Sequence, residues 1–183
     1  MKASNATTPG IVKALALTPK GATVAQVECL LLSGRGRLIL TGNLIGEAKD
    51  SAQVAVSLAR VRAKKFGIDP TEFLQTDIHF HIPGGPTKDG PSAGLAFLVA
   101  LVSAMTRKPV DSKTAFTGEL SLSGKIIGVG GFSKKSLAAF DAGIARLFAP
   151  DENISEINKL LPKRHSMKMI AANQIDEVLS HLF

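Results

Sequence analysis

A serine stands in a glycine-flanked turn at the expected start of an apolar helix. Residues 88–94 read Lys-Asp-Gly-Pro-Ser-Ala-Gly, and Pro91 suits the first helical position, because its φ is already helical and its missing N–H needs no partner there. Ser92 then lies in the first turn, where backbone N–H groups lack an intrahelical acceptor. Ser92 could therefore attack a carbonyl while the amides of Ser92 and Gly90 hold the oxyanion. The alternative is that Ser92 only begins the helix.

A serine nucleophile needs a base, and a pair of lysines is the best candidate in this sequence. The four histidines give no Ser-His-Asp order. A neutral lysine can replace histidine if burial lowers its pKa from about 10.4 toward 7–8. Lys134 and Lys135 open an expected helix directly after two glycines and among apolar residues. Periodicity does not choose between them, and each could instead be a solvated charge at a helix start.

Hydrophobic periodicity and turn residues predict one α/β domain of the α+β kind. Residues 11–17, 22–32 and 37–40 are expected to form an antiparallel β meander, followed by a long amphipathic helix at 45–66. Mixed strands and helices follow. The further strands are expected at 76–82, 114–122, 126–129, 145–148 and 167–170, and the further helices at 91–105, 132–142, 154–161 and 175–182.

The composition is that of a soluble, single-domain protein. The chain has 183 residues, of which 45% are hydrophobic and 20% charged. No stretch has the length of a membrane span, and residues 1–10 lack the apolar centre of a signal peptide. We therefore expect a cytoplasmic protein. The single cysteine, Cys29, lies among leucines and is expected to be a small buried hydrophobe.

Charge and histidine placement suggest two other functional classes, a nucleic-acid-binding or scaffold domain and a zinc hydrolase. A formal charge of +7 permits nucleic-acid binding, but the chain has no Trp or Tyr for stacking, and the basic group at 60–65 is expected to be the solvated end of a helix. Nucleic-acid binding, or a non-catalytic scaffold, is thus the alternative. A zinc hydrolase using Asp77, His79 and His81 on one strand face lacks a second ligand cluster, so no metal is expected.

Four stretches together carry a resemblance to a known family. They are residues 77–83, the serine turn at 88–94, residues 117–122, and residues 130–139 around the lysine pair. In order and spacing they resemble the proteolytic domain of Lon protease over about residues 10 to 182. We accordingly expect residues 1–9 to be a flexible or added N-terminal segment, and residues 10–183 to form a Lon-like proteolytic domain.

The resemblance implies a serine–lysine dyad, with Ser92 as the nucleophile and Lys135 as the base. The supporting positions that it implies are Thr117, which would hydrogen-bond the lysine, Asp89, which would shape the loop, and Glu119, His79 and Glu28 near the site. Glu119 reads equally well as an ion-pair partner. The chain departs from the family pattern at 86–88, where it has Pro-Thr-Lys, and at Ala14 and Leu17; the first departure bears on the substrate groove.

The resemblance also implies partners. A Lon proteolytic domain belongs to a serine endopeptidase that acts on unfolded or damaged proteins, forms a homo-hexamer and is coupled to an ATPase. This chain has no Gly-x-x-x-x-Gly-Lys-[Ser/Thr] loop. We therefore expect no cofactor in the chain itself, with ATP and Mg²⁺ confined to a separate ATPase module.

Overall fold

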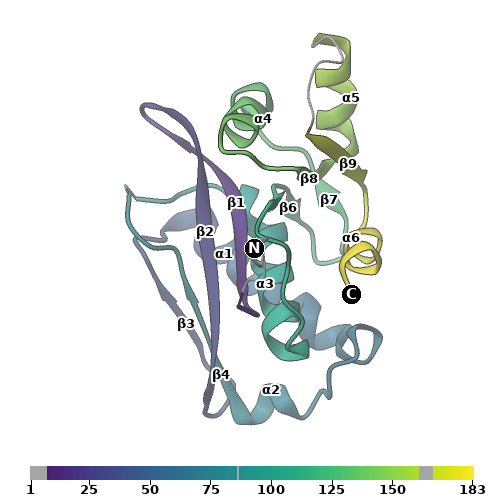
Figure 1. Ribbon diagram of the computed structural model, residues 1–183. Coiled ribbons are helices and arrows are strands. Elements are labelled where there is room, and N and C mark those ends of the chain that lie inside the picture. Colours follow the sequence, from purple (N-terminus) through teal and green to yellow (C-terminus); the bar gives the residue numbers. More distant parts are fainter. Residues whose placement is uncertain (1–7, 86, 161–166) are drawn as a thin grey trace, which may run out of the picture.

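A seven-stranded mixed sheet forms the centre of the computed structural model, which describes residues 8–85, 87–160 and 167–183 (Figure 1). Its strand order is β3-β4-β2-β1-β5-β8-β9, and β6 and β7 form a separate two-stranded hairpin. The strands are β1 (Ile11–Thr18), β2 (Gly21–Ser33), β3 (Leu38–Thr41), β4 (Thr76–His81), β5 (Thr114–Phe116), β6 (Glu119–Leu120), β7 (Ile126–Ile127), β8 (Arg146–Pro150) and β9 (Lys168–Ala172).

The predicted β meander is correct for its first hairpin and wrong for its third strand. β1 and β2 pair antiparallel, with Ile11 opposite Glu28 and Thr18 opposite Gly21. β3 does not pair with β2; it lies at the sheet edge and runs parallel to β4, which separates the two. The reason is the long helix between β3 and β4, because a strand, helix and strand in succession return the chain parallel to its start.

Helices cover the two faces of the sheet unequally. They are α1 (Gly46–Val61), α2 (Glu72–Gln75), α3 (Gly94–Thr106), α4 (Phe132–Asp141), α5 (Asp151–Leu160) and α6 (Ile175–Leu182), with 3₁₀ turns η1 (Ala63–Phe66) and η2 (Pro91–Ala93). α1, α3 and α6 pack on one face, and α4 and α5 pack on the other beside β1 and β8 (Figure 1). The predicted α/β domain is confirmed. None of the helices in the described ranges has the length and apolarity to cross a membrane.

Three predicted helices differ from the structure at one end. The helix expected at 91–105 opens with the 3₁₀ turn η2, and α3 itself begins at Gly94. The helix expected at 45–66 ends at Val61 and continues as the 3₁₀ turn η1, which Gly67 closes with a φ of +73°. The helix expected at 154–161 begins three residues earlier, at Asp151. Residue 161, like residues 1–7 of the expected N-terminal segment, lies outside the described residues.

Alternation along the central strands builds two apolar cores. Ala14 and Phe116 face the larger core, which contains α1, α3 and α6, whereas their neighbours Leu15 and Ala115 face the smaller core with α4 and α5. Successive side chains of a strand point to opposite faces, so the same short strands serve both cores. The serine turn precedes a helix of the larger core, and the lysine pair lies on a helix of the smaller core.

The helix after the serine turn is the most buried element of the larger core. In α3 every residue from Gly94 to Ser103 is buried, and Phe97 packs on Phe80 of β4 with ring centroids 4.9 Å apart. A helix that is apolar on all sides must be enclosed. The first turn of α3 is therefore enclosed by the elements around it.

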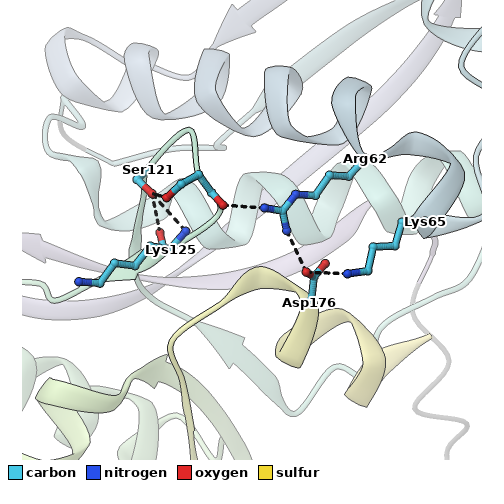
Figure 2. A network of polar contacts seen from close by, with 6 residues as sticks. Arg62, Lys65, Ser121, Lys125 and Asp176 are labelled. Carbon is cyan, nitrogen blue, oxygen red and sulfur yellow. Dashed lines mark hydrogen bonds and ion pairs between the residues drawn. The ribbon is translucent and has the colours of Figure 1, made fainter.

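The basic group at 60–65 is not the freely solvated helix end that the sequence suggests. Arg62 donates to the carboxylate of Asp176 on α6 at 2.9 Å and to the carbonyl of Ser123 at 2.6 Å, and Lys65 also reaches Asp176, at 2.8 Å (Figure 2). Arg60 donates to the carbonyl of Gly36. Arg62 and Lys65 therefore join the segment after α1 to α6, and Arg62 also joins it to the β6–β7 turn, whereas Arg60 binds the loop before β3.

Asp77, which the metal alternative would use, is occupied by arginine contacts. Its buried carboxylate accepts hydrogen bonds from the amides of Arg35 (2.8 Å) and Arg37 (2.9 Å) and from Nε of Arg37 (2.8 Å). The Arg37 side chain and these amides lower the pKa of Asp77 to about 2. No cluster of metal-ligating residues is found within the described ranges.

We expect the Asp77 contacts to set the acid stability of the fold. A carboxyl with a lowered folded-state pKa stabilises the fold above its unfolded pKa, and this contribution is lost from about pH 4 to about pH 2. Asp77→Asn should lower the urea midpoint at pH 7 and flatten its fall over that acid range. Urea unfolding at several pH values measures both effects, and Asp50→Asn, at an exposed helix position, is the control. An unchanged acid slope in Asp77→Asn would contradict this assignment.

Candidate active site

Ser92 lies in the 3₁₀ turn η2, directly before α3. Pro91 opens the turn, and Gly90 before it has a φ of +102°, a conformation that favours glycine. The Ser92 carbonyl accepts hydrogen bonds from the N–H of Gly118 (2.9 Å) and from Oγ1 of Thr117 (3.4 Å). The main chain of the serine is thereby fastened to the segment that follows β5.

This fastening explains why the strand expected at 114–122 is interrupted. β5 ends at Phe116, and β6 resumes only at Glu119. Gly118 has a φ of +156°, and a Cβ there would stand 2.7 Å from Cγ2 of Ile126. The Gly118 carbonyl in turn accepts the N–H of Leu95, at 3.1 Å. Gly118 thus leaves the ladder to bind η2 and the first turn of α3, whereas the N–H of Thr117 still donates to the carbonyl of Phe148 in β8, at 3.0 Å.

Asp89 fastens the same loop to the start of α1. Its Oδ1 accepts hydrogen bonds from the N–H of Glu47 (3.1 Å) and from the N–H of Gly90 (2.8 Å). The N-cap residue of α1, Ile45, provides no side-chain cap, so the carboxylate of Asp89 takes over a capping role for that helix. This contact agrees with the loop-shaping role expected of Asp89.

The contact of Asp89 corrects the expectation for Gly90. The sequence predicts that the Gly90 N–H helps to hold an oxyanion, but this N–H is already donated to Asp89. It becomes available only if that hydrogen bond breaks. The Ser92 N–H therefore remains as the proposed oxyanion donor from this pair.

Lys135 points into the protein, whereas its neighbour Lys134 is exposed. Both lie in the first turn of α4, which begins after Gly131, with a φ of +66°. The Lys135 side chain is 2% exposed, and the loss of water around it lowers its pKa from 10.5 to about 8. Of the two lysines that periodicity could not separate, only Lys135 has the environment that favours a neutral amine.

Ser92 and Lys135 line one groove. It has a volume of about 320 Å³, and its walls also include Glu119, the loop residues Asp89 and Gly90, and the main chain at 128–130. Most of the remaining lining is apolar, with both alanines and larger side chains such as Leu17, and Lys88 is a further charged residue of the groove. This combination of an apolar cleft with few convergent polar groups is typical of a substrate site.

A second hollow of similar volume lies on the outer side of α4. Its lining is almost wholly apolar, with Leu137, Phe140 and Met167, and includes Ser133 and Lys134 at its polar edge. Lys134 is exposed to water there. Because neither Ser92 nor Lys135 lines this hollow, we expect the chemistry in the groove that holds both of them.

Of the other supporting residues, Glu119 lies in the groove, whereas His79 and Glu28 lie on strands of the sheet. Glu119 lines the groove with Lys135 and makes no ion pair among the described residues. His79 and Glu28 lie on β4 and β2 and do not line the described groove. His79 shares a hydrogen bond with Thr41 (2.9 Å), and Glu28 accepts one from Gln26 (2.6 Å). Neither residue contacts the groove, and a place for them near the site stays a prediction.

Cys29 behaves as the sequence predicts. Its side chain is 7% exposed on the inner face of β2, and burial raises the pKa of its thiol. A thiol that resists ionisation is a poor nucleophile.

Two buried polar side chains of the site were not found from the sequence. Ser51 of α1 donates to the carbonyl of Pro91 at 3.2 Å. The side-chain amide of Asn153, on α5, makes two hydrogen bonds to the main chain of Val129 in the groove wall. Its Oδ1 accepts the N–H of Val129 at 2.8 Å, and its Nδ2 donates to the carbonyl of Val129 at 3.1 Å. The available signal for Ser51 was its helical spacing, three residues after the buried Ala48 and four before the buried Ala55.

Comparisons with known proteins identify the family of the chain. The family model described as the Lon protease (S16) C-terminal proteolytic domain matches residues 1–183. The chain belongs to this family. It is 45% identical to a Lon protease of Chloroflexus aggregans over 172 residues, which is 93% of this chain and 21% of that protein.

Two other Lon proteases are similar to the chain over almost its whole length. A Lon protease of Mycoplasma pneumoniae is 38% identical over 96% of the chain, and one of Rhizobium meliloti is 40% identical over 94%. The chain covers 22% of each of these two proteins, so it spans about a fifth of the length of these curated relatives.

The burial of Lys135 should cost stability at neutral pH. Because its folded pKa is below its unfolded value, the ammonium destabilises the fold below about pH 8, and this cost disappears as the pH rises toward 10.5. Lys135→Met should therefore raise the unfolding free energy at pH 7 by on the order of 2 kcal/mol, and the gain should shrink at pH 10. Chemical denaturation at both pH values tests this, with Lys134→Met as the exposed control. A variant less stable than wild type at pH 7 would contradict the proposed burial cost.

Proposed function

We propose that this chain is the proteolytic part of a Lon-type serine endopeptidase that hydrolyses peptide bonds of unfolded or damaged proteins. Ser92 is the nucleophile and Lys135 the general base. The single observation that carries the proposal is that the buried lysine with a lowered pKa lines the same groove as a serine in the first turn of a helix. Membership of the Lon family supports the same activity.

The reaction follows from the two protonation states of Lys135. The neutral amine takes the proton of Ser92 Oγ, and the oxygen adds to the scissile carbonyl to form the C–O bond of a tetrahedral intermediate. The Ser92 amide and the positive end of α3 stabilise the oxyanion. The lysine ammonium then gives its proton to the leaving amine as the C–N bond breaks. Water, activated by the same lysine, hydrolyses the acyl-enzyme and restores Ser92.

Thr117 is a positioning residue in this scheme. Its buried hydroxyl donates to the Ser92 carbonyl, so it orients the nucleophile. The resemblance to Lon proteases adds a second role, in which the same threonine hydrogen-bonds the base. A single hydroxyl that serves both groups would couple their positions.

The remaining features of the family are part of the proposal. The relatives are named Lon protease and are about five times as long as this chain, so the ATPase module, with ATP and Mg²⁺, is proposed to lie outside it. We further propose a homo-hexameric assembly, a cytoplasmic location, and a protein or peptide substrate as the partner of this domain. Nucleic-acid binding is not favoured, because Arg62 and Lys65 are already paired with Asp176.

The pH dependence of hydrolysis tests the base. Only neutral Lys135 accepts the serine proton, so the rate should rise with pH to a plateau, with a midpoint near the pKa of about 8. At pH 7 it should be roughly a tenth of the plateau value. Initial rates of cleavage of an unfolded, fluorescently labelled protein from pH 6 to pH 10 measure this. A flat profile would exclude a titrating lysine.

Matched substitutions test the two members of the dyad. Ser92→Ala and Lys135→Met should each reduce the rate by about a thousandfold or more, because each removes a group that the chemistry requires. Lys134→Met should keep most of the activity. Cleavage of the same unfolded protein is the readout, and circular dichroism checks folding. Equal losses in the two lysine variants would show that the base is assigned wrongly.

A further inference from the structure

We propose that Ser51, on the buried side of α1, is a positioning residue for oxyanion binding. Its hydroxyl holds the peptide group between Pro91 and Ser92, and so aims the Ser92 N–H at the reacting carbonyl. The inference rests on the proposed function. It assigns to α1, which supplies no reacting group, a direct influence on the rate of the chemical step.

The contact is made to the peptide that carries the oxyanion donor. Oγ of Ser51 donates to the Pro91 carbonyl at 3.2 Å, and the N–H of Gly94 donates to the same oxygen. A peptide group is planar, with its C=O and N–H pointing in opposite directions. Holding the Pro91 oxygen from the α1 side therefore fixes the direction of the Ser92 N–H.

The peptide on the other side of Ser92 is held independently. Its carbonyl accepts the hydrogen bonds from Thr117 and Gly118 that fasten the turn to the end of β5. The two peptide planes that flank the serine are thus oriented by different elements, the first by α1 and the second by the β5–β6 connection. Because the Gly90 N–H is bound to Asp89, the plane held by Ser51 contains the donor that is left of the pair Gly90 and Ser92.

The helix itself has no need of a serine at this position. Ser51 is 6% exposed and lies among the buried alanines Ala48, Ala52 and Ala55, and alanine is the better helix former. A serine inside a helix commonly donates to the carbonyl four residues earlier, as Ser57 does to Gln53 at 2.9 Å. Ser51 donates across to the catalytic turn instead. This contact also polarises the peptide, which makes the Ser92 N–H a stronger donor.

Kinetics and a transition-state analogue test this role. A peptide aldehyde adds Ser92 Oγ to its carbonyl carbon, while the serine proton passes to Lys135 and the former carbonyl oxygen becomes an oxyanion near the Ser92 N–H. The corresponding peptide alcohol binds the same groove without forming that oxyanion. Wild type, Ser51→Ala and Ser57→Ala, the matched control on the exposed side of α1, are compared for kcat, KM and the affinity for both peptides.

In Ser51→Ala we expect kcat and the aldehyde affinity to fall together, by roughly five- to tenfold. KM and the alcohol affinity should stay unchanged, and Ser57→Ala should match wild type. Alanine suits the neighbouring residues of α1, so the variant should fold, which a thermal melt verifies. Wild-type kcat and aldehyde affinity in Ser51→Ala would overturn the proposal, and so would equal losses for aldehyde and alcohol, which indicate a merely structural role.

Ser92→Ala separates the failure of this inference from that of the proposed function. If Ser92→Ala still hydrolyses the substrate, the proposed function is wrong, whatever Ser51→Ala does. If Ser92→Ala is inactive while Ser51→Ala is normal in every measurement, the dyad stands and only the role of Ser51 is lost.

Discussion

The site depends on keeping a lysine out of water. An ammonium is strongly hydrated, so the apolar surroundings that bury Lys135 favour its neutral form and lower its pKa to about 8. This environment needs the α4 layer to close over the sheet, with Phe132 and Ala139 packed in the smaller core. The α4 layer therefore has a chemical task as well as a structural one.

Ser92, the proposed nucleophile, has the opposite requirement, because a nucleophile must be exposed to substrate and yet fixed in direction. The turn achieves this by fastening its main chain and leaving the serine side chain at the groove. Ser51, Asp89 and the pair Thr117 and Gly118 each bind a different part of the loop. Because these contacts join the loop to α1 and to the end of β5, two elements far apart in the sequence fix the direction of the turn that carries Ser92.

Local sequence signals predicted most elements and pointed to Ser92 and to the pair Lys134 and Lys135. The turn around Pro91 and the alternation of the first hairpin were readable because their causes lie within a few residues of one another. The family resemblance, and not periodicity, chose Lys135 over Lys134, and burial distinguishes the same residue. Together these signals were enough to propose the reaction class.

The errors arose where distant segments meet. The edge position of β3 depends on a helical crossover, and the break at Gly118 depends on a turn 25 residues earlier. Arg62 looked solvated because its partner, Asp176, is far away in the sequence. Ser51 and Asn153 were missed for the same reason, since their acceptors and donors belong to other elements.

The division of the interior into two cores has a consequence for the proposed dyad. Ser92 precedes a helix of the larger core and Lys135 lies in a helix of the smaller one, and the strands between them are only three to eight residues long at β1, β5 and β8. The separation of the two side chains therefore depends on how the two cores pack across these strands. A substitution inside either core can alter this separation without touching a residue that lines the groove.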